Sequence, residues 1–542
     1  MKKTLLLLIA SFCTLTQAQI ERPKLIVGIV VDQMRPDYLY RYYNDYGEGG
    51  FKRLMKDGFL FRNTHYNYMP TYTAPGHASV YTGAIPAVHG IVGNSWFHRR
   101  EGVSVYCTAD TDVQGTGIGV GERDGMQSPR RLKTTTITDE LKLETNMRSK
   151  VIALSIKDRG AVLPAGHFGD AAYWMDKYGN FISSSYFLKE LPAWVANYNA
   201  QKNAQKYINQ GWSLSRPIET YDESLADDNP YEKVFEPMTK PVFPYDLKGI
   251  AAKQGNLEII KTTPYGNDML TELGIAAIKN ERLGKGEFTD FLAISYSSPD
   301  YAGHNWSPRS IEIQDMYLRL DQNFATLLNT LDAEVGKGNY LVFITADHAA
   351  AENPNYLREM GYNVRNLERN EVAGEVKQLL QQTFGQDLFL NYSNQNIYLN
   401  EELIREKNID YDNVVHTIRK HLESKPYVAR VYTEDEILRG NSTDYHLTLI
   451  KRGYDPRQNG QIVVLLDPQY MEYSHVGTTH GSTYMYDSHV PNIWYGWNVP
   501  AGQSPKKYHI TDIAPTISMM LNIKIPNGSE ASILEELVVD QK

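Results

Sequence analysis

Cysteine is almost absent from this chain of 542 residues, which contains only Cys13 and Cys107. Cys13 lies in an N-terminal segment with the pattern of a leader, so the mature chain would keep Cys107 alone. A single cysteine can form no internal disulfide, even in a protein addressed for export. The sequence therefore excludes a fold that depends on disulfide bonds.

Long apolar runs and an excess of positive charge are also missing. Beyond the leader, no run of 18 apolar residues occurs, so we expect no membrane anchor. The chain has 55 Lys and Arg against 64 Asp and Glu, a formal net charge of −9. That balance argues against non-specific binding of nucleic acid, which relies on cationic side chains. Taken alone, it also argues against an anionic substrate.

The first eighteen residues have the pattern of a signal peptide. Lys2 and Lys3 precede an apolar stretch, residues 5–16, that is too short to span a membrane. Thr16-Gln17-Ala18 then offers a cleavage site with small residues at both ends. Phe12 is too large for the position before a lipid-modified cysteine. We therefore expect an exported protein without a lipid anchor, periplasmic or alternatively secreted.

Short apolar runs rich in β-branched residues recur along the chain and alternate with segments of helical periodicity. Strands without polar alternation that are interleaved with helices indicate an α/β fold, with a mostly parallel central sheet sandwiched by helices. A long helix is predicted over residues 311–331. The strand runs are Leu25–Val31, Val151–Ile156, Phe291–Tyr296, Tyr340–Thr345 and Ile462–Leu466.

Two stretches depart from this alternation. Residues 185–265 are rich in Tyr, Pro and Asn, and residues 355–450 contain helical patterns at 376–384 and 414–422. Length alone would allow three or four domains. We instead interpret residues 19–542 as a single catalytic domain, in which these two stretches are insertions that cap the sheet.

Chemically active side chains follow four of the five strand runs. In open α/β sheets the working residues lie at the carboxyl ends of the strands. One acidic residue there is ordinary, because Asp often ends a strand as a turn or cap residue. Four such ends together indicate a site. The residues are Asp32 after the first run, Lys157 and Arg159 after the second, Asp300 and His304 after the third, and Asp347 and His348 after the fourth.

Carboxylates and imidazoles of this kind are zinc ligands. Asp300 and His304 are four residues apart, so one helical turn would bring them to the same face. A third imidazole is needed, and His480 in Gly-Thr-Thr-His-Gly-Ser is the best candidate, with His489 as the alternative. Together with Asp32, Asp347 and His348, this set is large enough to bind two zinc ions.

Thr73 is the candidate nucleophile, in the segment Thr73-Ala-Pro-Gly-His77. Pro75 suits the first turn of a helix, and free N–H groups at a helix start favour an anion. The alternative is that Thr73 is only an N-cap. His77 and His89 could orient a ligand or simply pack, and packing is the commoner role.

Together these segments resemble the alkaline phosphatase superfamily of two-zinc enzymes, and within it the bacterial alkaline phosphatases of the PafA type. The resemblance extends from Val-Val-Asp32-Gln-Met-Arg-Pro-Asp to the closing segment 509–518. It implies hydrolysis of small phosphate monoesters through a phosphothreonine. It also implies that Asn94, Lys157 and Arg159 bind the phosphoryl oxygens. The implied ligands are Asp32, Thr73, Asp347 and His348 at one zinc, and Asp300, His304 and His480 at the other.

Three other functions would require different residues. A phosphodiesterase or nucleotide pyrophosphatase on the same core would lack the Lys-x-Arg pair that stands here as Lys157 and Arg159. A sulfatase would have a Cys or Ser nucleophile where Thr73 stands. A catalytically inactive metal- or phosphate-binding protein would be expected to have lost part of the set, and every member is present.

Overall fold

The computed structural model describes residues 22–440 and 443–538. The expected leader, residues 1–18, lies outside the described residues. Among the helices of the described part, none combines the length and the apolar character that a membrane crossing requires.

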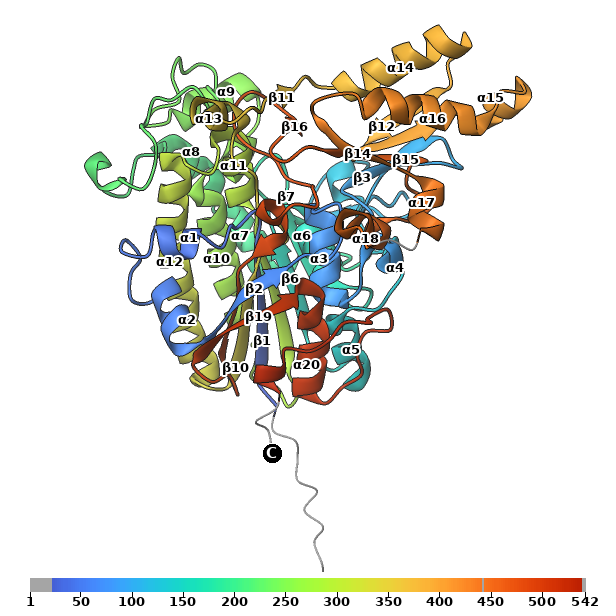
Figure 1. The fold of residues 1–542 in the computed structure, drawn as a ribbon. Helices are drawn as coiled ribbons and strands as arrows, with labels where there is room; N and C mark the ends of the chain where they lie inside the picture. The colour runs from blue at the N-terminus through green and yellow to red at the C-terminus, as the bar shows by residue number, and fades with distance from the viewer. Residues whose placement is uncertain (1–21, 441–442, 539–542) are drawn as a thin grey trace, which may run out of the picture.

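Four of the predicted strands lie side by side at the centre of an eleven-stranded sheet (Figure 1). Their order is β10–β1–β9–β6, and neighbouring strands run parallel. All their residues are buried, which explains the continuous apolar runs in the sequence. The predicted α/β core is therefore confirmed. The bounds are β1 Leu25–Val31, β6 Val151–Ser155, β9 Asp290–Tyr296 and β10 Tyr340–Thr345.

The margins of the sheet contain antiparallel strands, so the whole sheet is mixed around a parallel centre. β7 continues the parallel part beside β6, and β8 then pairs with it antiparallel. On the other side, β18 pairs antiparallel with β10 and leads to β2. β2 also pairs with β17 and β19. These strands are β2 Phe59–His65, β7 Ala171–Met175, β8 Phe181–Ser184, β17 His489–Val490, β18 Asn492–Gly496 and β19 Gly502–His509.

Helices cover both faces of the sheet. Figure 1 shows α10 and α12 on one side, and α3, α6 and α20 on the other. α12 has the predicted bounds, and its start is capped by Ser310, whose hydroxyl accepts a hydrogen bond from the Ile313 amide at 3.2 Å. The bounds are α3 Thr73–Thr82, α6 Asp158–Ala165, α10 Pro264–Asn280, α12 Ile311–Leu331 and α20 Ile513–Leu521.

Residues 366–466, which overlap the later of the two predicted insertions (355–450), build a second sheet with a hydrophobic cluster of its own (Figure 1, upper right). Four antiparallel strands are ordered β12–β13–β15–β14, and the two predicted helices lie in α14 and α16. The bounds are α14 Glu371–Phe384, β12 Phe389–Ser393, β13 Asn396–Leu399, α16 Tyr411–Leu422, β14 Val428–Thr433 and β15 Ile462–Leu466.

β15 corrects one expectation. The run Ile462–Leu466 does form a strand, but its assignment to the parallel sheet is wrong, because it pairs antiparallel with β13 and β14. All five of its residues are buried. A short apolar run indicates that a strand is buried, but it does not indicate to which sheet the strand belongs.

The earlier insertion packs into the main core and supports the end of one functional helix. Trp212 and Tyr245 stack on each other with ring centroids 5.5 Å apart, and both lie against Trp306. Trp306 is the last residue of α11 (Ser298–Trp306), two positions beyond His304. Residues 185–265 thereby fix the carboxyl end of the helix that carries Asp300 and His304.

Candidate active site

The register of the central sheet brings the predicted residues to one edge. Asp32 follows β1, Lys157 follows β6, and Asp347 follows β10, while Asp300 lies in the first turn of α11 after β9. All four side chains are buried. Neighbouring strands end at the same level, with Val31 opposite Tyr296, Val30 opposite Thr345, and Ser155 opposite Ser295.

Asp32, Asp347 and His348 form one cluster of potential metal ligands, which we call the Asp347 group. Their ligating atoms lie within 4.8 Å of one another, and the three side chains are completely buried. His348 Nε2 is 3.4 Å from Asp32 Oδ1 and 3.7 Å from Asp347 Oδ2. In the described part of the chain, all three of these atoms lack a hydrogen-bond partner. Buried polar atoms left without partners indicate that an unseen group binds there.

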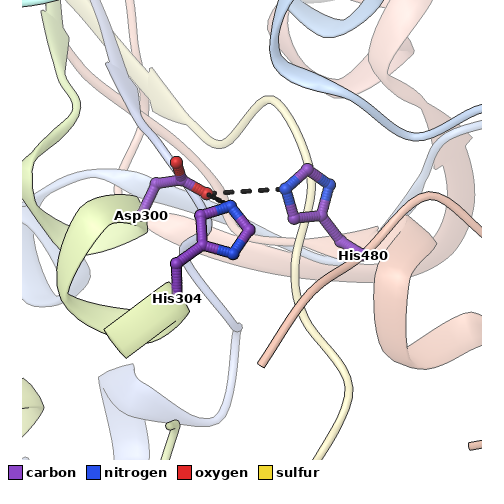
Figure 2. Close-up of side chains that lie close together, drawn as sticks. All are labelled: Asp300, His304 and His480. Atoms are coloured by element: carbon purple, nitrogen blue, oxygen red, sulfur yellow. Dashed lines mark ion pairs between the residues drawn. The ribbon is translucent and has the colours of Figure 1, made fainter. Parts of the chain in front are cut away.

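Asp300, His304 and His480 form a second cluster, the Asp300 group. Figure 2 shows His304 on the helix that carries Asp300 and His480 on a separate segment, both facing one oxygen of Asp300. His304 Nε2 is 3.1 Å and His480 Nε2 3.5 Å from Asp300 Oδ1. The i, i+4 spacing therefore places Asp300 and His304 on the same face of the helix, as expected for residues one turn apart.

The three histidines of both groups are held in the same way. Each Nδ1 donates to a backbone carbonyl, and since a carbonyl only accepts, Nδ1 carries the proton. In the neutral imidazole the Nε2 lone pair then faces carboxylate oxygens, an arrangement that a cation bound between them would stabilise. Carboxylate and imidazole donors arranged in this way fit a divalent metal such as zinc. The bonds are His348 to Ala349 at 3.0 Å, His304 to Thr478 at 2.7 Å and His480 to Thr71 at 2.7 Å.

Burial and mutual charge shift the titration of these groups. Burial and the neighbouring Asp32 hold the pKa of Asp347 well above its usual range. Burial holds the pKa of His348 well below its usual range. Burial opposes ionisation of Asp300 as well, but His304 and Lys157 outweigh it and keep that pKa well below normal. Like charges packed together in this way are typical of functional sites.

Lys157 bridges the two groups. Its Nζ lies 2.6 Å from Asp32 Oδ2 and 2.6 Å from Asp300 Oδ2, and it sits 4.9 Å from the centre of the Tyr301 ring. Burial opposes its charge, but Asp300 and Asp32 outweigh that effect and raise the pKa of Lys157. A cation fully paired with both acidic groups at 4% exposure is in position to meet an anion bound between them.

Thr73 is the first residue of α3, and the residue at the N-cap position is Tyr72. The alternative that Thr73 is merely an N-cap does not describe the structure. Thr73 as a whole residue is 1% exposed, and its hydroxyl makes no hydrogen bond to the described residues. Gly76 brings the helix start against the Asp347 group, since a Cβ there would lie 2.4 Å from the Asp347 carbonyl oxygen.

Asn94 lies beside this helix start, and Arg159 lies at the start of α6. Asn94 Oδ1 accepts a hydrogen bond from the Ala74 amide at 2.8 Å, which places Asn94 beside Thr73. Arg159 begins α6 with Asp158, and its Nη1 donates to the Tyr106 hydroxyl at 3.0 Å. Arg159 Nε is buried and has no partner in residues 22–440 and 443–538, so the guanidinium keeps a free donor.

His489, the alternative ligand, lies elsewhere. It stacks on His65 with ring centroids 4.6 Å apart, and its Nε2 donates to the Arg62 carbonyl at 2.9 Å. It belongs to β17 at the margin of the sheet and to neither ligand group.

His77 and His89 differ in their surroundings. His77 Nδ1 lies 2.9 Å from the Thr73 carbonyl and 3.4 Å from Asp347 Oδ2, and its Nε2 lies 2.8 Å from Ser295 Oγ. His77 therefore touches the Asp347 group. His89 is bonded to Ser79 and the Ile91 amide and touches neither group.

Gln33 was missed by sequence reasoning. Its Nε2 donates to Asp300 Oδ1 at 2.7 Å, and its amide donates to Asp347 Oδ1 at 3.2 Å, so it touches both groups. Its φ of 64° lies in the left-handed region that few non-glycine residues adopt. The only signal in the sequence is its place directly after Asp32. Tyr106 and Tyr301, which face Arg159 and Lys157, gave no signal either.

Comparison with known proteins places this arrangement among phosphate-ester hydrolases. The family model described as type I phosphodiesterase / nucleotide pyrophosphatase matches residues 26–489. A protein of Myroides odoratus named calcium-transporting ATPase is 44% identical over 97% of both chains. The alkaline phosphatase PafA of Elizabethkingia meningoseptica is 41% identical, over 96% of this chain and 95% of its own.

The structural similarity to PafA is equally extensive. Its crystal structure superposes with a TM-score of 0.92 at 41% identity, covering 96% of this chain and 100% of that one. A PafA variant substituted at one threonine, one asparagine, one lysine and one arginine matches with a TM-score of 0.91 at 40% identity, with the same coverage.

Proposed function

Since the chain belongs to the type I phosphodiesterase / nucleotide pyrophosphatase family of the alkaline phosphatase superfamily, we propose that it is an exported, zinc-dependent alkaline phosphatase of the PafA type. The observation that carries the proposal is the position of Lys157 between two carboxylate-histidine groups, next to a helix that begins at Thr73. The substrate class is small phosphate monoesters.

Thr73 is the proposed nucleophile. Its hydroxyl oxygen loses its proton to solvent and attacks phosphorus in line, the bond to the alcohol oxygen breaks, that oxygen takes up a proton, and a phosphothreonine forms. Water then hydrolyses the phosphothreonine, which releases inorganic phosphate and regenerates the hydroxyl. His77 supports this role, because its hydrogen bond to the Thr73 carbonyl and its contact with Asp347 fix the first turn of α3.

The non-bridging phosphoryl oxygens are the proposed partners of Asn94, Lys157 and Arg159. Two cations and an amide donor suit the dianion of a monoester. The electrostatic interactions between these groups and the phosphoryl oxygens are stronger in a buried site than in water. Asp32, Thr73, Asp347 and His348 would hold one zinc, and Asp300, His304 and His480 the other. When bound, two zinc ions lower the pKa of a coordinated hydroxyl and stabilise negative charge on oxygen.

A phosphodiesterase is the alternative. The family model that matches carries that description, and the two ligand groups would serve either reaction. Lys157 and Arg159 favour the monoesterase, because a diester has one charge fewer and a second ester group that would crowd these cations. The relative from Myroides adds ATP to the substrates worth testing, since its name describes an ATPase. A catalytically inactive binding protein is disfavoured, because the sequence contains every predicted ligand and the threonine.

Paired substrates test the proposal. Zinc content is measured by mass spectrometry, and hydrolysis of p-nitrophenyl phosphate is compared with that of its bis-ester. Thr73→Ala should abolish the phosphothreonine trapped by acid quench and lower kcat by at least about 10³-fold. Lys157→Ala should reduce kcat/KM for the monoester far more than for the diester.

Lys248, exposed on α9 (Leu247–Gln254), provides the matched control, and Lys248→Ala should change neither substrate. Equal losses on both substrates with Lys157→Ala would contradict the monoesterase assignment. A preparation without bound zinc and without activity after zinc is supplied would contradict the metal assignment.

A further inference from the structure

A cavity of about 260 Å³ opens beside the Asp300 group. His480 and the adjoining Tyr72 line it, with ring centroids 5.5 Å apart. The opposite wall comes from the later insertion and the segment after it, including Tyr392 on β12 and Glu472 on β16 (Met471–Glu472). The second sheet therefore completes a pocket that the main domain begins.

The position of the cavity matches one side of the proposed reaction. Thr73 approaches from the Asp347 group, because Gly76 and His77 of the same helix contact Asp347. The attacking and leaving oxygens lie roughly in line across phosphorus. The alcohol therefore departs on the side of the Asp300 group. His480 is the member of the two groups that lines the cavity, so the departing alcohol faces it.

The lining contains both acceptors and donors of hydrogen bonds. Glu472 and Asp487 contribute carboxylates, and Asn370, Asn394 and Gln395 contribute carboxamides. An ionised carboxylate only accepts, while carboxamides both donate and accept, so a ligand that matches this lining carries groups that do both, such as hydroxyl groups. An aryl group placed here would strip water from these polar atoms without replacing its hydrogen bonds, which is costly.

The walls are held in place before any ligand binds. Asp487 Oδ2 accepts hydrogen bonds from the Gly481 amide at 3.1 Å and the Ser482 amide at 2.8 Å. Tyr470 donates to the Asn363 carbonyl at 3.0 Å, and Asn394 donates to the Ser95 carbonyl at 2.7 Å. In a preformed pocket, ligand binding has only a small entropic cost for ordering side chains.

The charges of the lining disfavour a second phosphate. Arg369 is the one cation among the lining residues, and it is exposed. Two carboxylates stand against it. A nucleoside diphosphate or a bisphosphate would bring further negative charge toward Glu472 and Asp487. A neutral alcohol with several hydroxyl groups meets no such repulsion, and the tyrosine rings offer it flat apolar faces.

We propose that this cavity binds the alcohol portion of the substrate and selects a hydroxyl-rich group of monosaccharide size, so that sugar phosphates are preferred monoesters. The inference rests on the proposed monoesterase function. It assigns a role to the later insertion, since Asn370, Tyr392 and Gln395 belong to it.

Two substrates with primary-alcohol leaving groups test the inference. The ratio of kcat/KM for glucose 6-phosphate to that for ethyl phosphate should exceed ten in the wild-type enzyme. Glu472→Gln removes one carboxylate with little change of shape and should lower this ratio at least fivefold. Glu402→Gln is the matched control, because Glu402 lies on the later insertion, is exposed and lines a different cavity. The ratio should keep its wild-type value in that variant.

Product inhibition gives a second readout that needs no variant. Free glucose should inhibit hydrolysis of ethyl phosphate at concentrations where ethanol does not. A ratio near one in the wild-type enzyme, a ratio unaffected by Glu472→Gln, or equal inhibition by glucose and ethanol would overturn the inference while leaving the phosphatase intact. Failure to hydrolyse either ester would overturn the proposed function and this inference with it.

Discussion

Gln33 shows how a single side chain links the two ligand groups. The oxygen of Asp300 that it contacts is the oxygen that faces His304 and His480. Hydrogen bonds to a ligand from outside the metal's own shell hold that ligand in orientation, and their loss typically costs 10- to 100-fold in metal affinity. The left-handed φ of Gln33 is a strained backbone that the surroundings impose at a functional site.

Gln33→Ala is therefore expected to weaken zinc binding at the Asp300 group by about 10- to 100-fold. Competition with a fluorescent chelator would measure the loss. Gln33→Glu keeps the shape but replaces the donor with a carboxylate, so it should weaken binding at least as much. Gln322→Ala, on an exposed position of α12, is the control. Unchanged affinity in both Gln33 variants would contradict a positioning role.

His89 predicts a dependence of stability on pH. Its side chain is completely buried, its Nε2 lies 3.0 Å from Ser79 Oγ, and its Nδ1 accepts from the Ile91 amide at 3.1 Å. Burial lowers the pKa of His89 from 6.5 to about 3. Below pH 6.5 His89 becomes protonated in the unfolded chain but stays neutral in the folded protein. The stabilising contribution is thus complete above pH 6.5 and is lost as pH falls toward 3.

His89→Gln should reduce the slope of unfolding free energy against pH, by up to about 1.4 kcal/mol per unit between pH 6 and 4. Urea unfolding of the metal-free protein at several pH values measures the slope. His416→Gln, exposed on α16, controls for loss of an imidazole. Parallel pH profiles for wild type and His89→Gln would rule out this contribution.

At the scale of elements, α3 can place Thr73 near the Asp347 group because the helix approaches the end of β10 closely. A Cβ on Gly76 would lie 2.4 Å from the Asp347 carbonyl oxygen and 2.7 Å from Asp347 Cβ. Glycine at this point allows the helix start to touch the residue that follows the strand. The segment Thr-Ala-Pro-Gly-His thus combines a nucleophile with the small residue that positions it.

Gly76→Ala is expected to destabilise the protein by about 1–3 kcal/mol, the usual cost of overpacking, and to separate Thr73 from the Asp347 group. Gly374 in the middle of α14 is the matched control, because a Cβ there meets nothing within 4 Å. Gly374→Ala should be neutral or stabilising by up to about 1 kcal/mol. Urea midpoints and phosphatase activity would separate the two variants, and similar midpoints would contradict the close-approach argument.

At the scale of the whole molecule, two hydrophobic clusters lie side by side. The main core surrounds the large sheet, and a second cluster occupies the insertion between α14, α16 and β15. A smaller cluster joins them, in which Met69 of the main domain packs with Val463 and Leu465. Separate cores connected by few contacts open independently, because each contributes its own cooperative stability.

Leu380→Ala, in the second cluster, should speed hydrogen exchange mainly within residues 366–466, at a local cost of about 2–5 kcal/mol. Leu320→Ala on α12 makes the same cavity in the main core and should speed exchange throughout the large sheet. Both leucines are completely buried. Hydrogen exchange is measured by mass spectrometry. An equal increase in both regions with Leu380→Ala would contradict the view that the two cores open independently.

The net charge of the whole chain is a poor guide to whether the protein can bind phosphate. The chain as a whole carries −9, yet Lys157 and Arg159 stand beside the two ligand groups, and any divalent ions held there would make the site positive. Overall charge governs solubility and long-range steering, while a bound phosphate meets the local charges. The acidic composition therefore does not exclude an anionic substrate.

The sequence alone determined those features that repeat locally. Continuous apolar runs predicted the four central strands, because strands buried on both faces have no polar alternation. Helical spacing predicted α12 with its observed bounds and the joint placement of Asp300 and His304. The strand ends then indicated Asp32, Lys157 and Asp347, since parallel strands deliver their following residues to one edge.

Only the tertiary structure decided which distant segments meet. It places His480 beside Asp300 and His489 beside His65, although both histidines sit in similar short polar segments. It also assigns β15 to the second sheet and turns Gln33 toward both ligand groups. No periodicity connects residues nearly two hundred positions apart, and a backbone torsion imposed by packing leaves no pattern in composition. Such contacts follow from how the whole chain fills space, which a local reading of the sequence does not contain.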